Sequence, residues 1–248
     1  MRRFAAGAPP SGEREPPDEV ARLIGHPPEH EAETQVLAAL AFADTRAPLG
    51  ELRDWAEGLP GKERAAIFAE LSALRANRRH KLPRALETVR YTFDLVGDFG
   101  MYRDLHRHRM LTQERQPLST RLGYTMPEEV AAAGLAPRYE AALAEAAAAH
   151  EAIAPEFPAE AQYVVPMAYR IRWFVELSLR ELMWLVELRS SPQGHPAYRR
   201  MAQAMFRAVA QVHPRLAALI RFVDLEEHAL GRLDAEERRE RKQTARSP

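Results

Sequence analysis

The side chains best suited to chemistry gather in one short stretch of the 248-residue sequence, residues 106–121. This stretch contains Arg107-His108-Arg109, then Gln113-Glu114, then Ser119-Thr120-Arg121. Guanidinium groups bind phosphate oxygens through paired hydrogen bonds, and hydroxyl or backbone N–H groups can complete the shell around the anion. The stretch therefore predicts a binding site for phosphate or a similar anion. The competing interpretation is a basic surface that is covered only by water.

Proton transfer and metal binding have weaker support. His80 and Glu87 precede the basic stretch and could exchange protons beside a bound phosphate, although a carboxylate at the edge of a strand is more simply explained by an arginine partner. His106 and His108 are two residues apart, so on a helix they would not converge on one metal ion. We therefore predict no metal site.

The composition excludes several classes of function. The sequence has no cysteine, which rules out disulfides, thiolate zinc sites, iron–sulfur clusters and cysteine nucleophiles. Lys+Arg and Asp+Glu both number 35, so no net charge draws the protein to nucleic acid or to an anionic membrane. The sequence shows neither a signal-peptide pattern nor an apolar run of about 18 residues. We expect a cytoplasmic protein with no nucleic-acid or membrane partner.

The spacing of apolar residues predicts the elements that position the basic stretch. Apolar side chains alternate at Val89, Tyr91, Phe93 and Leu95, which is typical of a half-buried strand. On the same grounds we expect strands at residues 87–96, 162–167 and 171–177. We expect an ordered loop at 110–126. Helical spacing predicts helices at 29–44, 51–58, 62–78, 101–109, 127–152 with a break near 134–137, 179–188 and 196–231.

These elements suggest how the chain is organised. We expect a flexible N-terminal tail or linker remnant at residues 1–28, a single domain at 29–232 and a charged C-terminal tail at 233–248. Arg103 and Arg107 are four residues apart on one expected helix, so both can face one side. Arg180 and Arg189 are nine apart, which points them to opposite sides of their helix and toward different sites or subunits.

Four motifs in this order resemble those of the flavin-dependent thymidylate synthase family. Arg107-His108-Arg109 and Ser119-Thr120-Arg121 resemble its RHR triplet and Ser-x-Arg signature. His80 and the segment Glu87-Thr88-Val89-Arg90-Tyr91-Thr92-Phe93 resemble its Glu-bearing strand, and Gln162-Tyr163-Val164-Val165-Pro166 resembles its strand ending in Leu-Pro. Leu179-Arg180-Glu181-Leu182-Met183 and Leu188-Arg189 resemble its Arg-Ser-Leu-Met helix and closing Leu-Arg. The resemblance extends from residue 33 to residue 220.

This resemblance implies a fold and a reaction. The family has an α/β (α+β) fold with a central antiparallel sheet flanked by long helices, assembled as a homotetramer with active sites between subunits. It binds FAD and dUMP, and takes methylene-tetrahydrofolate and NADPH as co-substrates. Reduced flavin drives the reductive methylation of dUMP to dTMP in nucleotide biosynthesis, and the enzyme needs no cysteine. The cysteine-free composition agrees with that chemistry.

The resemblance also assigns roles to individual residues. Ser119 and Arg189 would be catalytic. Together with Arg121 they would bind dUMP. The residues expected to hold the cofactor are Arg107, His108, Arg109, Glu114 and Arg180.

Several departures from the family pattern define an alternative. Nine residues, 110–118, separate the RHR triplet from Ser119, two more than the family spacing. Gln162 stands where the family has an arginine, and Trp184 where it has an asparagine. Each lost charged contact could weaken binding by about 1.5–3 kcal/mol. The alternative is therefore a catalytically degenerate paralogue that binds flavin or nucleotide, or that serves as a structural partner in a hetero-oligomer with a related chain.

Overall fold

The computed structural model describes residues 20–228 and Arg241. These residues form two compact units, and each is described here by itself. The larger unit comprises residues 21–95, 100–115 and the chain from residue 172 onward. The smaller unit comprises residues 96–99 and 116–171, together with Val20.

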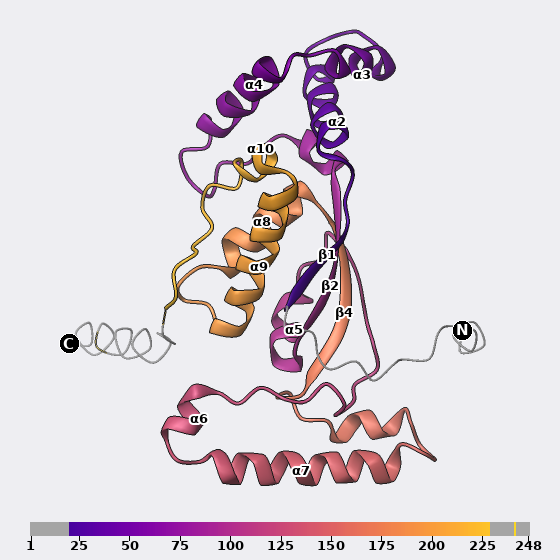
Figure 1. Cartoon of the computed structure of the whole chain (residues 1–248), viewed down its shortest axis with the longest axis vertical. Coiled ribbons are helices and arrows are strands. Elements are labelled where there is room, and N and C mark those ends of the chain that lie inside the picture. The colour runs from indigo at the N-terminus through magenta and orange to yellow at the C-terminus, as the bar shows by residue number, and fades with distance from the viewer. Residues whose placement is uncertain (1–19, 229–240, 242–248) are drawn as a thin grey trace, which may run out of the picture. The chain divides into compact units, whose positions relative to one another are not determined.

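A four-stranded sheet organises the larger unit, in the order β1-β2-β4-β3 (Figure 1). The strands are β1 (Ala21–Gly25), β2 (Arg90–Asp98), β3 (Thr112–Arg115) and β4 (Arg170–Ser178). β1 pairs antiparallel with β2, and β3 pairs antiparallel with β4. The predicted fold class, a mixed α/β fold with an antiparallel sheet and flanking helices, is confirmed.

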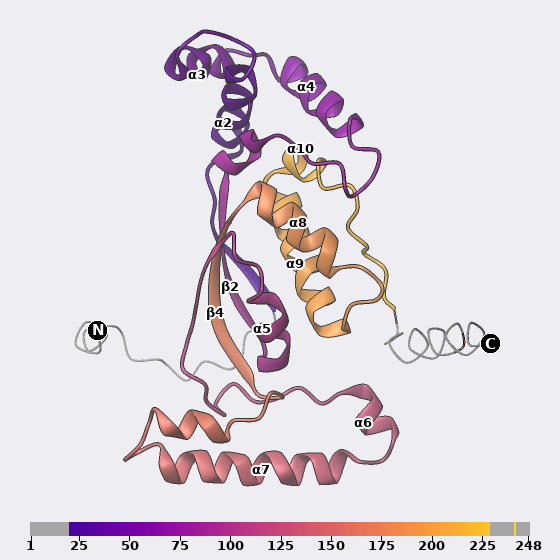
Figure 2. The ribbon, with the colours of Figure 1, turned by 180° about the vertical axis from the view of Figure 1, so that it is seen from behind.

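One face of this sheet carries the core of the larger unit. Tyr91 and Phe93 of β2 and Trp173 and Leu177 of β4 are each at most 1% exposed. Alternate residues of a strand point to one face, so the alternation read from the sequence places these side chains together. The helices α5 (Phe99–Leu105), α8 (Leu179–Arg189) and α9 (Pro196–Val212) lie on this side of the sheet, as Figures 1 and 2 show.

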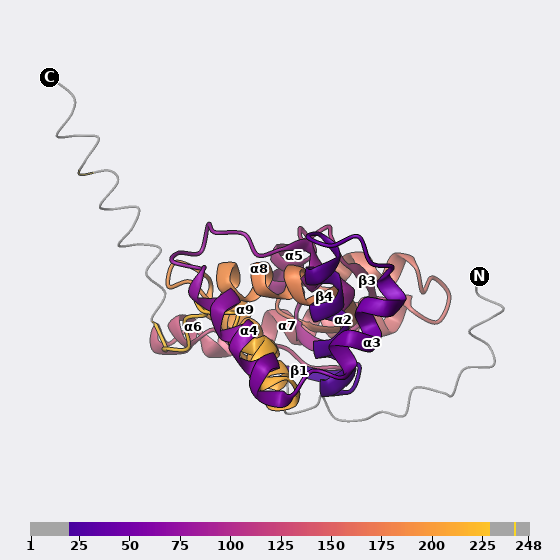
Figure 3. The same cartoon turned by 90° about the horizontal axis from the view of Figure 1, so that it is seen from above.

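Short helices complete the larger unit. They are α2 (Glu29–Phe42), α3 (Leu49–Glu57), α4 (Gly61–Ala73), the 3₁₀ helix η1 (Arg84–Thr88) and α10 (Pro214–Ala217). α2 packs against α3 (Figure 3). α10 packs against α9 and α4. A proline in extended conformation precedes each of α2, α3 and α4, which gives each helix a sharp start.

The smaller unit contains α6 (Glu128–Ala132), α7 (Ala136–Ile153) and the 3₁₀ helix η2 (Glu160–Val164). Gly134 lies between α6 and α7 with a φ of 69°, a conformation that suits glycine and breaks the helix where the sequence predicted. The buried Tyr169 donates a hydrogen bond from its hydroxyl to the Leu143 carbonyl of α7, at 2.7 Å. This bond ties α7 to the segment that leads into β4.

Three predictions about the elements near the basic stretch are wrong. Residues 21–25, expected in the tail, form the edge strand β1. Residues 112–115, expected in a loop, form β3, because their polar side chains hide the alternation that marks a strand. α5 ends at Leu105 rather than at 109, so Arg107 lies beyond the helix and does not share a helical side with Arg103.

Two further predictions fail near prolines. The run at 162–167 is not a strand: residues 160–164 form η2, and Tyr163 is 91% exposed. The helix expected at 196–231 ends at Val212, because His213 leaves the helical conformation before Pro214. Residues 1–19 and nearly all of the tail at 233–248 lie outside the described residues, and the single domain at 29–232 stays a prediction. No helix within residues 20–228 is both long enough and apolar enough to cross a membrane.

Candidate functional site

His108 is the centre of the basic stretch, and it is buried. Its side chain lies just past the end of α5, and the residue is 6% exposed. Nδ1 lies 3.0 Å from a carboxylate oxygen of Glu181 on α8, and Nε2 accepts a hydrogen bond from Nε of Arg189 at 3.0 Å. A guanidinium group only donates, so Nε2 must carry a lone pair. This network assigns His108 as the neutral tautomer with its proton on Nδ1.

Arg189, at the end of α8, is held from several directions. Besides its bond to His108, it donates from Nη2 to the carbonyl of Asp104 at 2.7 Å. Its guanidinium carbon lies 5.3 Å from the centre of the Tyr198 ring. Burial lowers the pKa of Arg189 and the positive charge of Arg107 lowers it further, while Tyr198 opposes both effects. The two hydrogen bonds use two of its five N–H groups, so the guanidinium keeps donors for a ligand.

The two arginines that flank His108 are exposed. Arg107 forms an ion pair with the carboxylate of Asp104, whose carbonyl binds Arg189. Asp104 therefore holds two of the predicted site residues at once. Arg109 has no ion pair within residues 20–228. Arg107 lies close enough to Arg189 for its charge to lower the pKa of that guanidinium, so two cationic groups lie near the end of α5. Such a pair suits an anionic ligand.

Gln113, rather than the predicted Glu114, faces this cluster. Gln113 donates from its side-chain amide to the carbonyl of His106 at 3.0 Å and lies 3.5 Å from that of His108. Glu114 pairs in the sheet with Phe174, which is 40% exposed, whereas Gln113 pairs with the buried Val175. Successive strand residues point to opposite faces, so Glu114 lies on the face of the sheet away from the core. Its predicted role in holding the cofactor stays untested.

Arg180, at the other end of α8, binds a different partner. It donates to Glu87 at 2.9 Å and to the carbonyl of Leu82 at 3.1 Å. The hydrogen bond from Arg84 lowers the pKa of Glu87, the bond from Arg180 lowers it as well, and burial opposes them. Glu87 therefore stays ionised and suits an ion pair better than proton donation, as the simpler interpretation of this carboxylate held. Arg180 and Arg189 have separate partners, in line with their nine-residue spacing.

The other predicted substrate residues belong to the smaller unit. Ser119 is half-buried and Arg121 is exposed. Gln162, which replaces an arginine of the family pattern, accepts a hydrogen bond from the backbone of Leu118 at 2.9 Å. Gln162 thus supports the segment that leads to Ser119. Among the predicted residues, the structure brings Arg107, His108 and Arg189 together. Arg109 directly follows His108 in the chain, and the roles of all the predicted site residues stay predictions.

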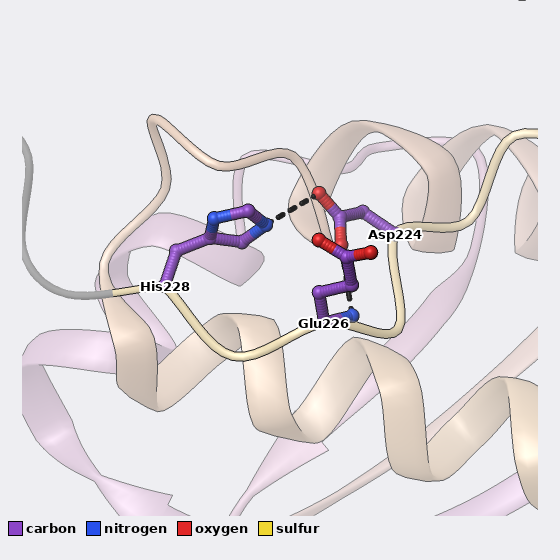
Figure 4. Close-up of side chains that lie close together, drawn as sticks. All are labelled: Asp224, Glu226 and His228. Atoms are coloured by element: carbon purple, nitrogen blue, oxygen red, sulfur yellow. Dashed lines mark hydrogen bonds and ion pairs between the residues drawn. The ribbon is translucent and has the colours of Figure 1, made fainter.

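Asp224, Glu226 and His228 form the group whose geometry comes nearest to that of a metal site (Figure 4). Their potential ligand atoms lie within 4.8 Å of one another. Asp224 is already bonded to Nε2 of His228 and to the backbone N–H of Glu226, both at 2.9 Å. The buried Arg199 lies 3.9 Å from Asp224 and donates to the carbonyl of Glu226. This neighbouring cation and the internal hydrogen bonds account for the cluster as a brace of the chain after α10.

Sequence reasoning missed three residues that support the site: Glu181, Asp104 and Tyr198. It named Gln113 as part of the basic stretch but gave it no separate role. Glu181 belongs to a helix-capping pattern, Ser178-x-x-Glu181. This pattern alone accounts for a glutamate at the start of a helix, so it gives no reason to assign Glu181 to a functional site. The Ser178 hydroxyl does accept a bond from the Glu181 backbone at 3.3 Å, but the carboxylate turns to His108 instead. No local sequence pattern predicts such a contact, because 73 residues separate Glu181 from His108.

The fold and the site together define an α/β protein with an antiparallel sheet and a cationic site. The site is built on a relay of hydrogen bonds from Glu181 through the buried His108 to Arg189. Comparison with known families gives a more specific class. The profile of a family described as thymidylate synthase complementing protein matches residues 22–215. The chain belongs to this family, the flavin-dependent thymidylate synthases.

Three related proteins share most of this chain. UPF0159 proteins of Chlamydia muridarum (strain MoPn / Nigg) and Chlamydia pneumoniae are 45% and 44% identical to it over 205 and 206 residues, 83% of the chain in each case. A UPF0159 protein of Thermoplasma acidophilum is 36% identical over 223 residues, 89% of the chain. The matched regions cover only 39%, 39% and 44% of these three relatives, so the chain spans about two fifths of their length.

Proposed function

We propose that the chain acts as an FAD-dependent thymidylate synthase, which methylates dUMP to dTMP with methylene-tetrahydrofolate and NADPH. Membership of the family supports the reaction class. The observation that carries the proposal is the position of Arg189 near Arg107, with His108 accepting a hydrogen bond from its guanidinium group. These residues come from two of the four motifs that resemble the family.

The chemistry of the donor set fits the diphosphate of FAD. Arg107 and Arg109 are exposed guanidinium groups, and both belong to the set that the resemblance assigns to the cofactor. Guanidinium groups are well matched to phosphate oxygens. Bound flavin would supply the reducing equivalents for the methyl transfer. The chain's own residues would bind the anionic part of the cofactor, keep its position fixed and exclude water around the buried His108.

Arg189 is the residue we assign to the substrate. Negative charge develops on a carbonyl oxygen of the uracil ring during the reaction, and a fixed donor stabilises such charge best when it needs no reorganisation. Arg189 meets this condition, because His108, the carbonyl of Asp104 and the Tyr198 ring all restrain it. In this proposal Ser119 and Arg121 bind dUMP, as the resemblance implies.

An activity assay with matched variants tests this assignment. We expect dTMP formation from dUMP, methylene-tetrahydrofolate, NADPH and FAD. Arg189→Ala should lower kcat by about 10²–10³-fold, the usual loss for one fixed donor to developing charge. Arg53→Ala, which changes an exposed arginine of α3, should leave the rate unchanged. Full activity of Arg189→Ala would contradict the assignment.

A degenerate paralogue is the second candidate, favoured by particular contacts. Arg180 is paired with Glu87, and Gln162 with the backbone of Leu118, so neither side chain stands free for a ligand. Such a protein would bind FAD without forming dTMP, and would act as the partner of an active synthase. The two candidates are separated by measuring FAD binding and dTMP formation on the same preparation.

We further propose that the protein assembles as a multimer, a homotetramer or a hetero-oligomer with a related chain. The family membership supports this, because the family pattern places its active sites between subunits. Light scattering on the purified chain should give a mass that is a multiple of 28.1 kDa. A strictly monomeric protein that still forms dTMP would contradict the proposal.

A further inference from the structure

The carboxylate of Glu181 is an unexpected component of the cationic site. It lies at the start of α8, one helix length away from Arg189, and its side chain is only 12% exposed. Glu181 does not contact Arg189 in the described structure. The imidazole of His108 connects the two residues. Its Nδ1 lies 3.0 Å from the carboxylate of Glu181, and its Nε2 accepts a hydrogen bond from Arg189 at 3.0 Å.

This order of contacts has only one consistent proton arrangement. Arg189 can only donate, so Nε2 of His108 must accept. If the imidazole carried its proton on Nε2, two donors would face each other and the bond to Arg189 would be lost. An ionised carboxylate can only accept, so Glu181 favours the tautomer with the proton on Nδ1.

The surroundings offer little alternative to Glu181 as the hydrogen-bond acceptor for Nδ1–H of His108. The His108 side chain is 4% exposed, so bulk water has little access to Nδ1. Gln113 binds the carbonyl groups on both sides of Arg107, which fixes the backbone of the turn. The Ser178 hydroxyl caps the backbone of Glu181 and fixes the first turn of α8.

We infer that Glu181 is a positioning residue: it holds His108 in the Nδ1–H tautomer, and His108 in that form fixes the guanidinium of Arg189 for its anionic ligand. The relay itself is a property of the folded chain. Only its consequence for FAD and dUMP rests on the proposed function.

Nitrogen NMR of the ¹⁵N-labelled full chain tests the relay without any ligand. Long-range ¹H–¹⁵N correlations of the imidazole distinguish the two tautomers and the imidazolium ion. At pH 7.5 we expect the wild-type His108 as the Nδ1–H tautomer, with a slowly exchanging Nε–H signal from Arg189. A wild-type His108 in the Nε2–H or the doubly protonated form would overturn the inference, whatever the variants do.

Two substitutions separate positioning from packing. Glu181→Gln keeps an acceptor oxygen for Nδ1–H and should keep both the tautomer and the protected Arg189 signal. Glu181→Leu keeps the bulk and removes the acceptor, and should give a mixture of tautomers and fast exchange at Arg189. The matched control is Glu176→Leu, at a glutamate whose side chain is 42% exposed, and it should leave both signals unchanged. A folded Glu181→Leu with wild-type signals would overturn the inference.

A dUMP titration of the FAD-loaded protein then connects these contacts to binding, because Arg189 is the residue assigned to dUMP. Glu181→Leu should weaken dUMP binding about tenfold, or about 1.4 kcal/mol, while Glu181→Gln should stay within twofold of the wild type. If the wild type binds neither FAD nor dUMP, the proposed function fails while the NMR result still decides the role of Glu181 on His108. If the wild type binds dUMP and Glu181→Leu binds it equally well although its His108 tautomers are mixed, the positioning role is wrong.

Discussion

At the residue scale, ligand binding depends on which guanidinium N–H groups already have a partner within the chain. Arg107 lies in the predicted motif, yet its guanidinium pairs with the carboxylate of Asp104. Arg189 is restrained but keeps spare N–H groups. A ligand that binds here must therefore compete with one carboxylate for Arg107, and it meets a prearranged donor at Arg189.

Replacing Asp104 tests that competition. Asp104→Asn keeps the backbone carbonyl that binds Arg189 and removes the charge that neutralises Arg107. Exposed ion pairs are worth about 0.2–1 kcal/mol, so FAD should bind roughly 1.4- to 5-fold more tightly at low salt. Fluorescence titration at two salt concentrations would measure this, with Asp54→Asn on α3 as the control. Weaker binding by Asp104→Asn would mean that Arg107 needs its partner to be held in place.

The sequence assigns roles to single residues only where they belong to a recognisable pattern. Arg107 and Arg189 were found because their motifs keep their order along the chain. Glu181 was given no part in the site beyond its place in a motif, and Gln113 was named in the basic stretch without a role of its own. Glu181 acts across 73 residues of chain, and Gln113 lies on a strand whose polar sequence resembles a loop. The roles of both residues could not be predicted for the same physical reason: tertiary contacts determine which polar side chain turns inward.

At the scale of elements, a buried ion pair fixes α8, the helix that carries Glu181 and Arg189. Arg75, just after α4, binds both carboxylate oxygens of Glu187 at 2.5 and 2.6 Å. Glu187 also accepts from the backbone of Phe222, and both charged side chains are at most 2% exposed. The end of α8 is thereby joined to two segments that are distant in the sequence.

Removing one partner of this pair should be costly. Glu187→Gln leaves the buried guanidinium of Arg75 without a counter-charge, and we expect the free energy of unfolding to fall by about 3–5 kcal/mol. Urea denaturation measures this change. Glu176→Gln breaks the exposed pair with Arg90 and should cost less than about 1 kcal/mol. Equal losses in the two variants would contradict the account, and Arg75→Met combined with Glu187→Leu should recover part of the lost stability.

The sequence predicted elements reliably where apolar periodicity was clear. β2, β4 and α8 lie close to where the alternating and helical patterns placed them. β1 and β3 were missed because they are short edge strands of five and four residues. Such strands are defined by pairing with a neighbour, and a local pattern of side chains contains little information about that pairing.

At the scale of the whole molecule, one buried histidine couples stability to pH. His213 is 0% exposed, and its Nδ1 lies 2.7 Å from the Tyr91 hydroxyl. Nε2 lies 3.0 Å from the carbonyl of Pro27. Burial lowers the pKa of His213 below its usual value, although the carbonyl of Pro27 opposes that shift. The histidine therefore joins α9, β2 and the segment before α2 in its neutral form.

The sign of the pH dependence follows from this shift. The unfolded chain binds a proton at His213 more readily than the folded chain, so stability is complete above pH of about 6.5 and falls below it. The slope from this one group is at most about 1.4 kcal/mol per pH unit. His213→Gln should be less stable at pH 7.5 and show a shallower loss between pH 7 and 5. His150→Gln on α7 should keep the wild-type slope, and an unchanged slope in His213→Gln would exclude this residue as the cause.

The measurement that tests the central claim most directly is the visible absorbance spectrum of the purified protein, recorded with added FAD and then with dUMP. We predict that FAD binds, that its band shifts again when dUMP is added, and that Arg107→Ala loses the bound flavin. A flavin absorbance band that does not change when dUMP is added would contradict the proposed synthase activity and favour the degenerate paralogue. A protein that takes up no FAD would contradict the proposed site itself.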